Sequence, residues 1–440
     1  MRRLLAEALP DQGLASTKPL RSRALEWAGI LSSYFGSQTL TQLLGVASGL
    51  LLVRFMPLQE FALYTLATSA VTIFTLSTDL GSTASLVHFF REAAKEGEDF
   101  RGYLSAVLSL RRAVFLVGAI IVLLVLPAAA ARKGFALRAS FAVTAAVLVA
   151  VWLQIVSSPR LLALRLTGHY GDSYRAEIWG GALRLILTLA MLASAFLQAW
   201  AGIAASALGV MLTAHLADSP AAHAEARAIE KAAFRRRILR FLLPTLPSAL
   251  FFSVQGPLTV WLCATFGTTH NIAEVGALSR LGLIVGLLSG LSGAVLLPRL
   301  ASIKDDRLFR VRSLQFALLL SVLAGLILAG AVAAPKAFLA LLGPHYSGLQ
   351  TELLLLIAGS GLTLVGGYTV SVNFARGWTR FQPLTLVVEV ATQAALVAVL
   401  PLSRTSGVLL FMLLSAATGL TLQLVVLFLG FRRPAWVRWI

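Results

Sequence analysis

Long uninterrupted runs of apolar residues, separated by short polar segments, dominate the pattern along this chain of 440 residues. Each run is about twenty residues long, the length with which an α-helix crosses about 30 Å of hydrocarbon. The runs lack the strict alternation of polar and apolar residues that is typical of strands in a membrane barrel. The pattern therefore predicts an all-α polytopic membrane protein.

About twelve transmembrane helices follow when two of the longest runs are divided. Residues 185–217 are uncharged, but Gln198 and Gly202 favour a tight turn between two helices. Residues 241–273 are also uncharged, and the polar stretch 267–271 predicts a loop there. The predicted helices are residues 29–53, 61–88, 113–131, 139–160, 177–197, 201–217, 241–263, 274–298, 313–334, 352–373, 383–402 and 407–430.

The longest segment between predicted helices, residues 218–240, divides them six and six. We expect a linker helix there whose arginines Arg235, Arg236 and Arg237 lie at the headgroups of the inner leaflet; a docking site or gate is the alternative. The predicted organisation is a cytoplasmic N-terminal tail at 1–28, an N-terminal six-helix bundle at 29–217, this basic cytoplasmic linker at 218–240, and a C-terminal six-helix bundle with a short basic tail at 241–440.

Composition and charge agree with a membrane protein and set its orientation. The chain is 58% hydrophobic and only 13% charged, which excludes an ordinary water-soluble enzyme and a disordered chain. Its net charge of +18 would favour nucleic acid in a soluble protein, but we find no nucleic-acid motif and predict no such partner. With the N-terminus inside, 29 of the 37 basic residues fall in predicted cytoplasmic segments and 6 in external ones. Both termini are therefore predicted to be cytoplasmic.

No motif in the chain predicts catalysis, a metal or a cofactor. Cys263 is the single cysteine, and the six histidines are scattered without ligand spacing. We find no nucleophile elbow and no phosphate-binding glycine loop. The longest predicted external segment, about 335–351, is short for a membrane-bound glycan polymerase or ligase. We therefore predict that the chain is not an enzyme.

Arginines within the predicted helices are the first candidates for function, because each unpaired charge in hydrocarbon costs several kcal/mol. Arg280 lies in the eighth helix and is the leading candidate for an anion-binding group; snorkelling to headgroups or a structural pair are the alternatives. Arg184 in the fifth helix could contact substrate or pair with Glu177 two turns earlier. Arg54 ends the first helix, where an interfacial anchor is the simpler interpretation.

Two carboxylates are candidates for ion coupling. Glu389 lies in the eleventh predicted helix beside Gln393, and it could bind a proton or cation or pair with an arginine. Asp79 lies in the second, before Gly81, where a cation site and a local helix break are both compatible with the sequence.

Helix breakers predict a moving gate in the seventh and eighth helices. Prolines and glycines at membrane depth are tolerated where helices bend around a cavity, although both residues are also common in ordinary membrane helices. The predicted gate residues are Pro244, Pro247, Pro257, Gly282, Gly286 and Gly290.

Several segments, in the expected order along the chain, resemble the bacterial polysaccharide flippases of the multidrug/oligosaccharidyl-lipid/polysaccharide exporter superfamily. The first, at 56–64 with Phe61 and Tyr64, is similar to the family pattern P-x-x-x-[FY]-G-x-[YF], except that Ala62 replaces the glycine. The other similar segments are Asp79-Leu80-Gly81, 275–280, 297–301, 341–346 and 373–377.

The resemblance implies two six-helix bundles around a central cavity that work by alternating access. It implies translocation of an undecaprenyl-pyrophosphate-linked oligosaccharide to the outer leaflet of the bacterial inner membrane, for lipopolysaccharide or other surface polysaccharide assembly. Cavities of the family tend to be cationic, so Arg280, Arg184 and Arg54 are the pyrophosphate candidates. Membrane lipids, a glycan polymerase and chain-length proteins are the implied partners.

Three rival functions remain open. A cation-coupled multidrug antiporter of the same superfamily should carry an acidic, aromatic cavity, whereas this chain has few membrane carboxylates and prominent arginines. A peptidoglycan-precursor flippase would usually have two more helices. A membrane-embedded glycan polymerase or ligase is the alternative from a different class, and a test for covalent change of the lipid-linked substrate would separate it.

The asymmetry of basic residues generates a topology prediction. Reporters fused after residues 200, 268 and 345 should read external, and those after 228 and 378 internal, because positively charged loops stay in the cytoplasm. Accessibility of each reporter in intact cells is the measurement. A cytoplasmic signal at residue 268 would contradict the predicted helices.

Overall fold

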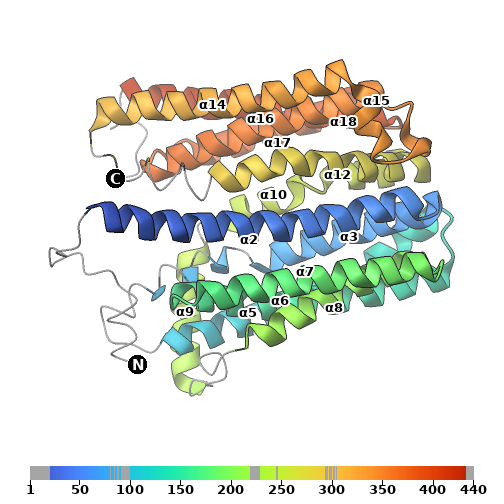
Figure 1. Cartoon of the computed structure of the whole chain (residues 1–440), viewed down its shortest axis with the longest axis horizontal. Helices are drawn as coiled ribbons and strands as arrows, with labels where there is room; N and C mark the ends of the chain where they lie inside the picture. Colours follow the sequence, from blue (N-terminus) through green and yellow to red (C-terminus); the bar gives the residue numbers. More distant parts are fainter. Residues whose placement is uncertain are drawn as a thin grey trace. The chain divides into compact units, whose positions relative to one another are not determined.

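The computed structural model describes residues 20–432 except 80, 84, 87–88, 91–99, 219–227, 244–245, 293–295, 297–299, 301–302 and 304. Its regular elements over this part of the chain are all helical. They are α2 (Leu20–Phe55), α3 (Leu58–Asp79), α5 (Phe100–Arg132), α6 (Leu137–Leu166), α7 (Tyr170–Ala193), α8 (Ala199–Leu216), α9 (Ala228–Leu242), α10 (Leu246–Gln255), α11 (Leu258–Phe266), α12 (Thr269–Leu291), α14 (Asp306–Ala333), α15 (Pro335–Ala340), the 3₁₀ turn η4 (Pro344–Tyr346), α16 (Gln350–Ala375), α17 (Gln382–Val399) and α18 (Thr405–Arg432) (Figure 1).

The predicted fold class, an all-α polytopic membrane protein, is confirmed. Ten helices among the described residues are long and apolar enough to cross a membrane, and α10 with α11 makes an eleventh if that bent pair is one span. The first predicted span lies on α2, a further helix of 36 residues. Every one of the twelve predicted spans thus falls on a helix or on the bent pair.

Several helix ends differ from the predicted ones for local reasons. Helix α3 ends at Asp79 instead of residue 88, where Gly81 adopts a φ of 79° that favours glycine. Helix α12 begins at Thr269, five residues early, because Thr268 and Asn271 form a capping box. The predicted seventh helix is two helices bent by 63° at Gly256 and Pro257, where proline supplies no backbone N–H.

The chain divides into two compact units. Unit 1 comprises Met1–Phe55 and Leu66–Pro257, and unit 2 comprises Met56–Thr65 and Leu258–Ile440. The first turns of α3 therefore group with the C-terminal helices. In unit 1, α8 packs on α6 and α7, and α2 packs on α7; in unit 2, α16 packs on α12, α14 and α18. The predicted six-and-six bundles at 29–217 and 241–440 stay a prediction.

Amide side chains join three helices of unit 2. Asn373 of α16 is fully buried, and its Nδ2 donates to the backbone carbonyl of Gln423 at 3.1 Å and to its Oε1 at 3.0 Å. Gln382 at the start of α17 exchanges amide hydrogen bonds with the same Gln423 side chain, at 3.2 and 3.3 Å. Such bonds hold helices together in hydrocarbon, where packing gains no hydrophobic driving force.

Glycine sets the closeness of α7 and α8 in unit 1. A Cβ added to Gly180 of α7 would lie 2.6 Å from the carbonyl oxygen of Gly209 and would also overlap the hydroxyl of Thr213. That hydroxyl donates to the Ala176 carbonyl of α7 at 3.2 Å. The two backbones therefore approach as closely as the small-residue interfaces of membrane helices allow.

We expect Gly180→Ala to destabilise unit 1 by about 1–3 kcal/mol, because the added methyl group forces α7 and α8 apart. Gly171→Ala is the matched control: it lies on the same helix, and a Cβ there meets no atom within 4 Å. Thermal unfolding of the purified protein in detergent measures both. Equal melting temperatures for the two variants would contradict the close contact.

Candidate functional site

Arg280 lies near the middle of α12. It is eleven residues beyond the helix start at Thr269, or about 16 Å along the axis at 1.5 Å per residue. Its guanidinium carbon lies 5.7 Å from the ring centroid of Tyr64, a fully buried residue of α3. A cation over an aromatic face gains about 0.5–2 kcal/mol, so Tyr64 holds one face of the guanidinium.

Small residues of α12 bring its neighbours close on either side of Arg280. A Cβ at Gly276, one turn before Arg280, would overlap the Thr65 side chain of α3. A Cβ at Gly282 would lie 3.4 Å from Oγ of Ser360 and 3.8 Å from Leu356, both in α16. Arg280 is therefore fixed between the start of α3 and α16 by packing within unit 2.

Arg184, like Arg280, lies within a helix that is long and apolar enough to cross a membrane, here α7 of unit 1. A Cβ at Gly209 of α8 would lie 3.2 Å from the Cβ of Arg184, so the side chain starts at the α7–α8 contact. Its Nε is buried, and no described residue accepts a hydrogen bond from it. Arg54 is different: it is exposed at the end of α2, 6.0 Å from the Phe55 ring, as an interfacial anchor would be.

The structural pair considered for Glu177 exists, but with another arginine. Arg165 of α6 donates from Nη2 to Oε2 of Glu177 at 2.7 Å and from Nε to Oγ of Ser173 at 2.9 Å. The alternative in which Glu177 pairs with Arg184 is wrong, because the last turn of α6 brings a nearer guanidinium to the carboxylate. A helix-wheel reading of α7 alone could not detect that neighbour.

Asp79 takes part in a polar network at the break after α3. Its carboxylate accepts hydrogen bonds from Oγ1 of Thr83 at 2.6 Å and from Oγ of Ser82 at 3.1 Å. Arg111 of α5, with 3% of its side chain exposed, forms an ion pair with this carboxylate. Arg111 also donates to Ser82 at 2.7 Å and to Ser158 of α6 at 2.6 Å.

This network accounts for Asp79 without a bound cation, and its coupling role stays a prediction. Arg111 was missed because α5 begins at Phe100, thirteen residues before the predicted helix, so the residue was assigned to a cytoplasmic loop. The remaining signal was the run Leu108-Ser109-Leu110 before it, which continues the helix.

Glu389 is a carboxylate within a membrane-spanning helix that has no charged partner among the described residues. It lies in the middle of α17, and its Oε1 would lie 3.3 Å from a Cβ at Gly419 of α18. Among the described residues, none forms an ion pair or hydrogen bond with this carboxylate. Gly419 thus leaves room for a carboxyl group that no protein cation neutralises.

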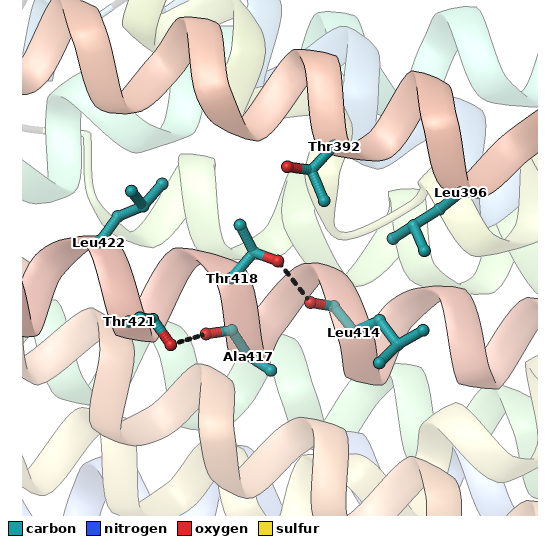
Figure 2. A pocket seen from close by; sticks show the side chains of 7 residues that line it. All are labelled: Thr392, Leu396, Leu414, Ala417, Thr418, Thr421 and Leu422. Carbon is teal, nitrogen blue, oxygen red and sulfur yellow. Dashed lines mark hydrogen bonds between the residues drawn. The ribbon is translucent and has the colours of Figure 1, made fainter.

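A groove of about 390 Å³ runs between α17 and α18, one turn from Glu389. Figure 2 shows Thr392 and Leu396 of α17 facing Leu414, Thr418 and their neighbours on α18. The hydroxyls of Thr418 and Thr421 donate back to their own helix, at 3.0 Å and 2.8 Å. With those hydroxyls satisfied, the groove presents a largely apolar wall.

A second polar cluster, which the sequence did not reveal, lies at the start of α12. Glu274 contacts His270 at 3.0 Å and accepts a hydrogen bond from Thr405 of α18. Asn271 donates to the same threonine at 2.9 Å. Burial and then the charge of Glu274 raise the pKa of Tyr346, in η4, to about 12. The cluster ties the first turns of α12, α18 and η4 together.

The structure brings together residues from motifs that the resemblance rests on. Tyr64, in the first similar segment, contacts Arg280 in the segment 275–280. In the segment 373–377, Arg376 forms an ion pair with Asp306 of α14 at 3.2 Å. The spacing along the chain could not show these contacts, because each joins helices far apart in sequence.

The proposed gate residues have mixed surroundings. Pro257 lies at the break between α10 and α11, and Pro247 is exposed in the first turn of α10. Gly282 contacts α16, whereas a Cβ at Gly286 meets no atom within 4 Å and Gly290 is exposed. Pro244 lies outside the described residues. The gate therefore stays a prediction.

Metal chemistry finds no support in the part of the chain that the structure describes. No three His, Cys, Asp or Glu side chains there gather closely enough to hold a metal ion. Cys263 is buried in α11 and forms no disulfide.

No protein-family model matches the sequence, and no curated protein matches it. The fold, however, is similar to that of solved membrane transporters. The lipid II flippase MurJ, in an inward closed conformation, has a TM-score of 0.72 at 13% identity, with 90% of this chain and 87% of that chain covered. An inward-facing multidrug resistance transporter of the MATE family has a TM-score of 0.60 at 14% identity, with 89% and 95% covered.

A third similar structure is a transporter of the MOP superfamily from Pyrococcus furiosus, described by the reversed polarity of its binding pocket. Its TM-score is 0.53 at 14% identity, with 91% of this chain and 94% of that chain covered. The chain thus has the fold of this exporter superfamily, as the resemblance implied. Membership of that superfamily, and of the polysaccharide flippases within it, stays a prediction.

The Asp79 network generates a prediction about stability. Arg111→Gln should lower the free energy of unfolding by about 3–5 kcal/mol, because it leaves the partly buried carboxylate of Asp79 uncompensated. Asp79→Asn combined with Arg111→Gln should lose less than the two single changes together, since neither charge then remains alone. Thermal melting in detergent of the natural protein, the two single variants and the double variant gives the coupling energy between the two side chains. Additive losses would show that the ion pair is not structural.

Proposed function

We propose that the chain translocates an undecaprenyl-pyrophosphate-linked oligosaccharide from the inner to the outer leaflet by alternating access. The observation that carries this proposal is Arg280, a guanidinium in the middle of a membrane-spanning helix with Tyr64 over one face. An arginine at that depth persists where it faces water, a carboxylate or an anionic ligand. Its planar fork matches two phosphate oxygens at once, which an ammonium group does not.

Charge balance and fold likeness support the same class of cargo. Basic residues outnumber acidic ones by 37 to 19, and Arg184 of unit 1 is a second partly buried arginine whose Nε is buried. The lipid II flippase is among the similar structures, and its cargo is lipid-linked. In the proposed cycle Arg280 binds a pyrophosphate oxygen pair, while Tyr64 and the tight contact at Gly276 keep the guanidinium from turning away.

The second candidate function is cation-coupled multidrug export, and Glu389 is the observation that favours it. A carboxylate in the middle of α17 without a protein cation is suited to bind a proton or a metal cation. The groove beside it has the apolar wall that a drug-like cation would occupy. The likeness to the MATE transporter supports this reading as well as the flippase supports the first.

We predict that Arg280→Ala reduces flipping of the lipid-linked oligosaccharide by about 30-fold or more, because loss of one partner of a buried charge pair costs about 2–5 kcal/mol. Arg280→Lys should keep only part of the activity, since the charge survives and the fork geometry is lost. The measurement is the accessibility of a fluorescently labelled undecaprenyl-pyrophosphate oligosaccharide in proteoliposomes, normalised to the amount of inserted protein.

Two controls separate the competing interpretations. Arg138→Ala removes an exposed arginine at the start of α6 and should flip normally. Glu389→Gln should also flip normally in the absence of a gradient, but it should abolish proton-driven uptake of a cationic dye if the chain is a multidrug antiporter. Normal flipping by Arg280→Ala would refute the pyrophosphate role. Lower abundance with unchanged activity per molecule would assign Arg280 to structure instead.

A further inference from the structure

The linker helix α9 packs on α5, and Figure 1 shows it running across the direction of α5, α6 and α7 of unit 1. One face of α9 is buried against α5: Ile238 is 0% and Leu242 3% exposed. The Leu242 side chain also reaches within 3.6 Å of a Cβ position at Gly81. The apolar face of α9 is therefore used by the protein itself, and it is not available for insertion into lipid.

Contacts with α5 fix the place along that helix at which α9 packs. The Phe234 ring occupies the space beside Gly102 and lies 4.4 Å from the Tyr103 ring, centroid to centroid. Gly102 lies in the first turn of α5, a helix that is long and apolar enough to cross a membrane. The helix α9 therefore packs at the N-terminal end of a membrane-crossing helix, on the side where its chain enters the span.

The outer face of α9 carries positive charge that no described side chain neutralises. Arg236 and Arg240, four residues apart, share the face opposite Ile238, and both are exposed. Arg235 is exposed as well, whereas Arg237 donates to the Tyr103 hydroxyl at 2.9 Å. None of the ion pairs among the described residues involves Arg235, Arg236 or Arg240. Residues 231–240 contain five basic and no acidic side chains.

An exposed leucine continues the same face toward the hydrocarbon. Leu243 directly follows α9, has 67% of its surface exposed, and lies within about 60° of Arg236 and Arg240 around the helix axis at 100° per residue. An arginine pair with an apolar side chain next to it matches a lipid, which offers a phosphate beside an acyl chain. A soluble anion would have no use for the leucine.

We propose that Arg236, Arg240 and Leu243 bind anionic phospholipid headgroups of the leaflet in which α9 lies. The guanidinium groups contact the lipid phosphates, and Leu243 enters the upper acyl region. Because the opposite face of α9 is packed on α5, this lipid contact holds the start of α5 at the membrane surface. The proposal stands independently of the transported substrate.

The test measures binding of fluorescently labelled phosphatidylglycerol to the full-length protein in mixed micelles with phosphatidylcholine. Removing both charges in Arg236→Gln/Arg240→Gln should weaken binding about 30-fold, because each basic residue near an anionic surface contributes about fivefold. Arg236→Lys/Arg240→Lys should bind almost as well as the natural protein, since the attraction depends on charge. That variant also shows whether the positions tolerate substitution.

The matched control, Arg132→Gln/Arg138→Gln, removes two exposed arginines, one at the last residue of α5, about 45 Å along that helix from its contact with α9, and one in the first turn of α6; it should leave binding unchanged. Equal affinities for the glutamine variant of α9 and the natural protein would overturn the proposal. Displacement of the lipid by submillimolar inorganic pyrophosphate would overturn it too, because the face would then be a site for soluble anions. Similar affinities for labelled phosphatidylglycerol and phosphatidylcholine would also overturn the proposal.

Discussion

Hydrocarbon offers neither hydrogen-bond partners nor compensation for charge, and the packing of this protein depends on that constraint. Several of the polar side chains that lie between helices are paired with one another. Arg111 bonds to oxygen atoms of Asp79 and Ser82 at the end of α3 and of Ser158 in α6, and Arg165 pairs with Glu177 across the α6–α7 turn. In unit 2 the buried amide of Asn373 bonds to α18. These contacts determine which helices are neighbours.

Small residues make such pairing geometrically possible. Where α7 meets α8, Gly180 and Gly209 bring the backbones close enough for Thr213 to bond across the interface. Gly276 likewise lets α12 approach the start of α3 closely, one turn from Arg280. Close backbones raise the dispersion attraction that membrane helices rely on. Close packing of the backbones also restricts the movement of long polar side chains that lie one turn away.

Against this background of satisfied groups, a few side chains are exceptional. Nε of Arg184 and the carboxylate of Glu389 lack hydrogen-bond partners among the described residues. The guanidinium of Arg280 lies near the ring of Tyr64. An unpaired charge costs energy in hydrocarbon, which makes Arg184 and Glu389 candidates for a functional role. The proposed function assigns the arginines to an anionic cargo, and the second candidate function assigns Glu389 to a coupling cation.

The sequence by itself determined the class of protein and the number of spans. Apolar runs of about twenty residues can be read without tertiary information, because a helix in lipid satisfies its own backbone. Helix ends were harder to predict from the sequence. The capping box at Thr268 and the break at Gly81 put the start of α12 and the end of α3 several residues away from the predicted positions. Only the tertiary structure could decide the partners of Asp79, Glu177 and Arg280. Each partner comes from another helix, and the packing of helices depends on surfaces that no local pattern records.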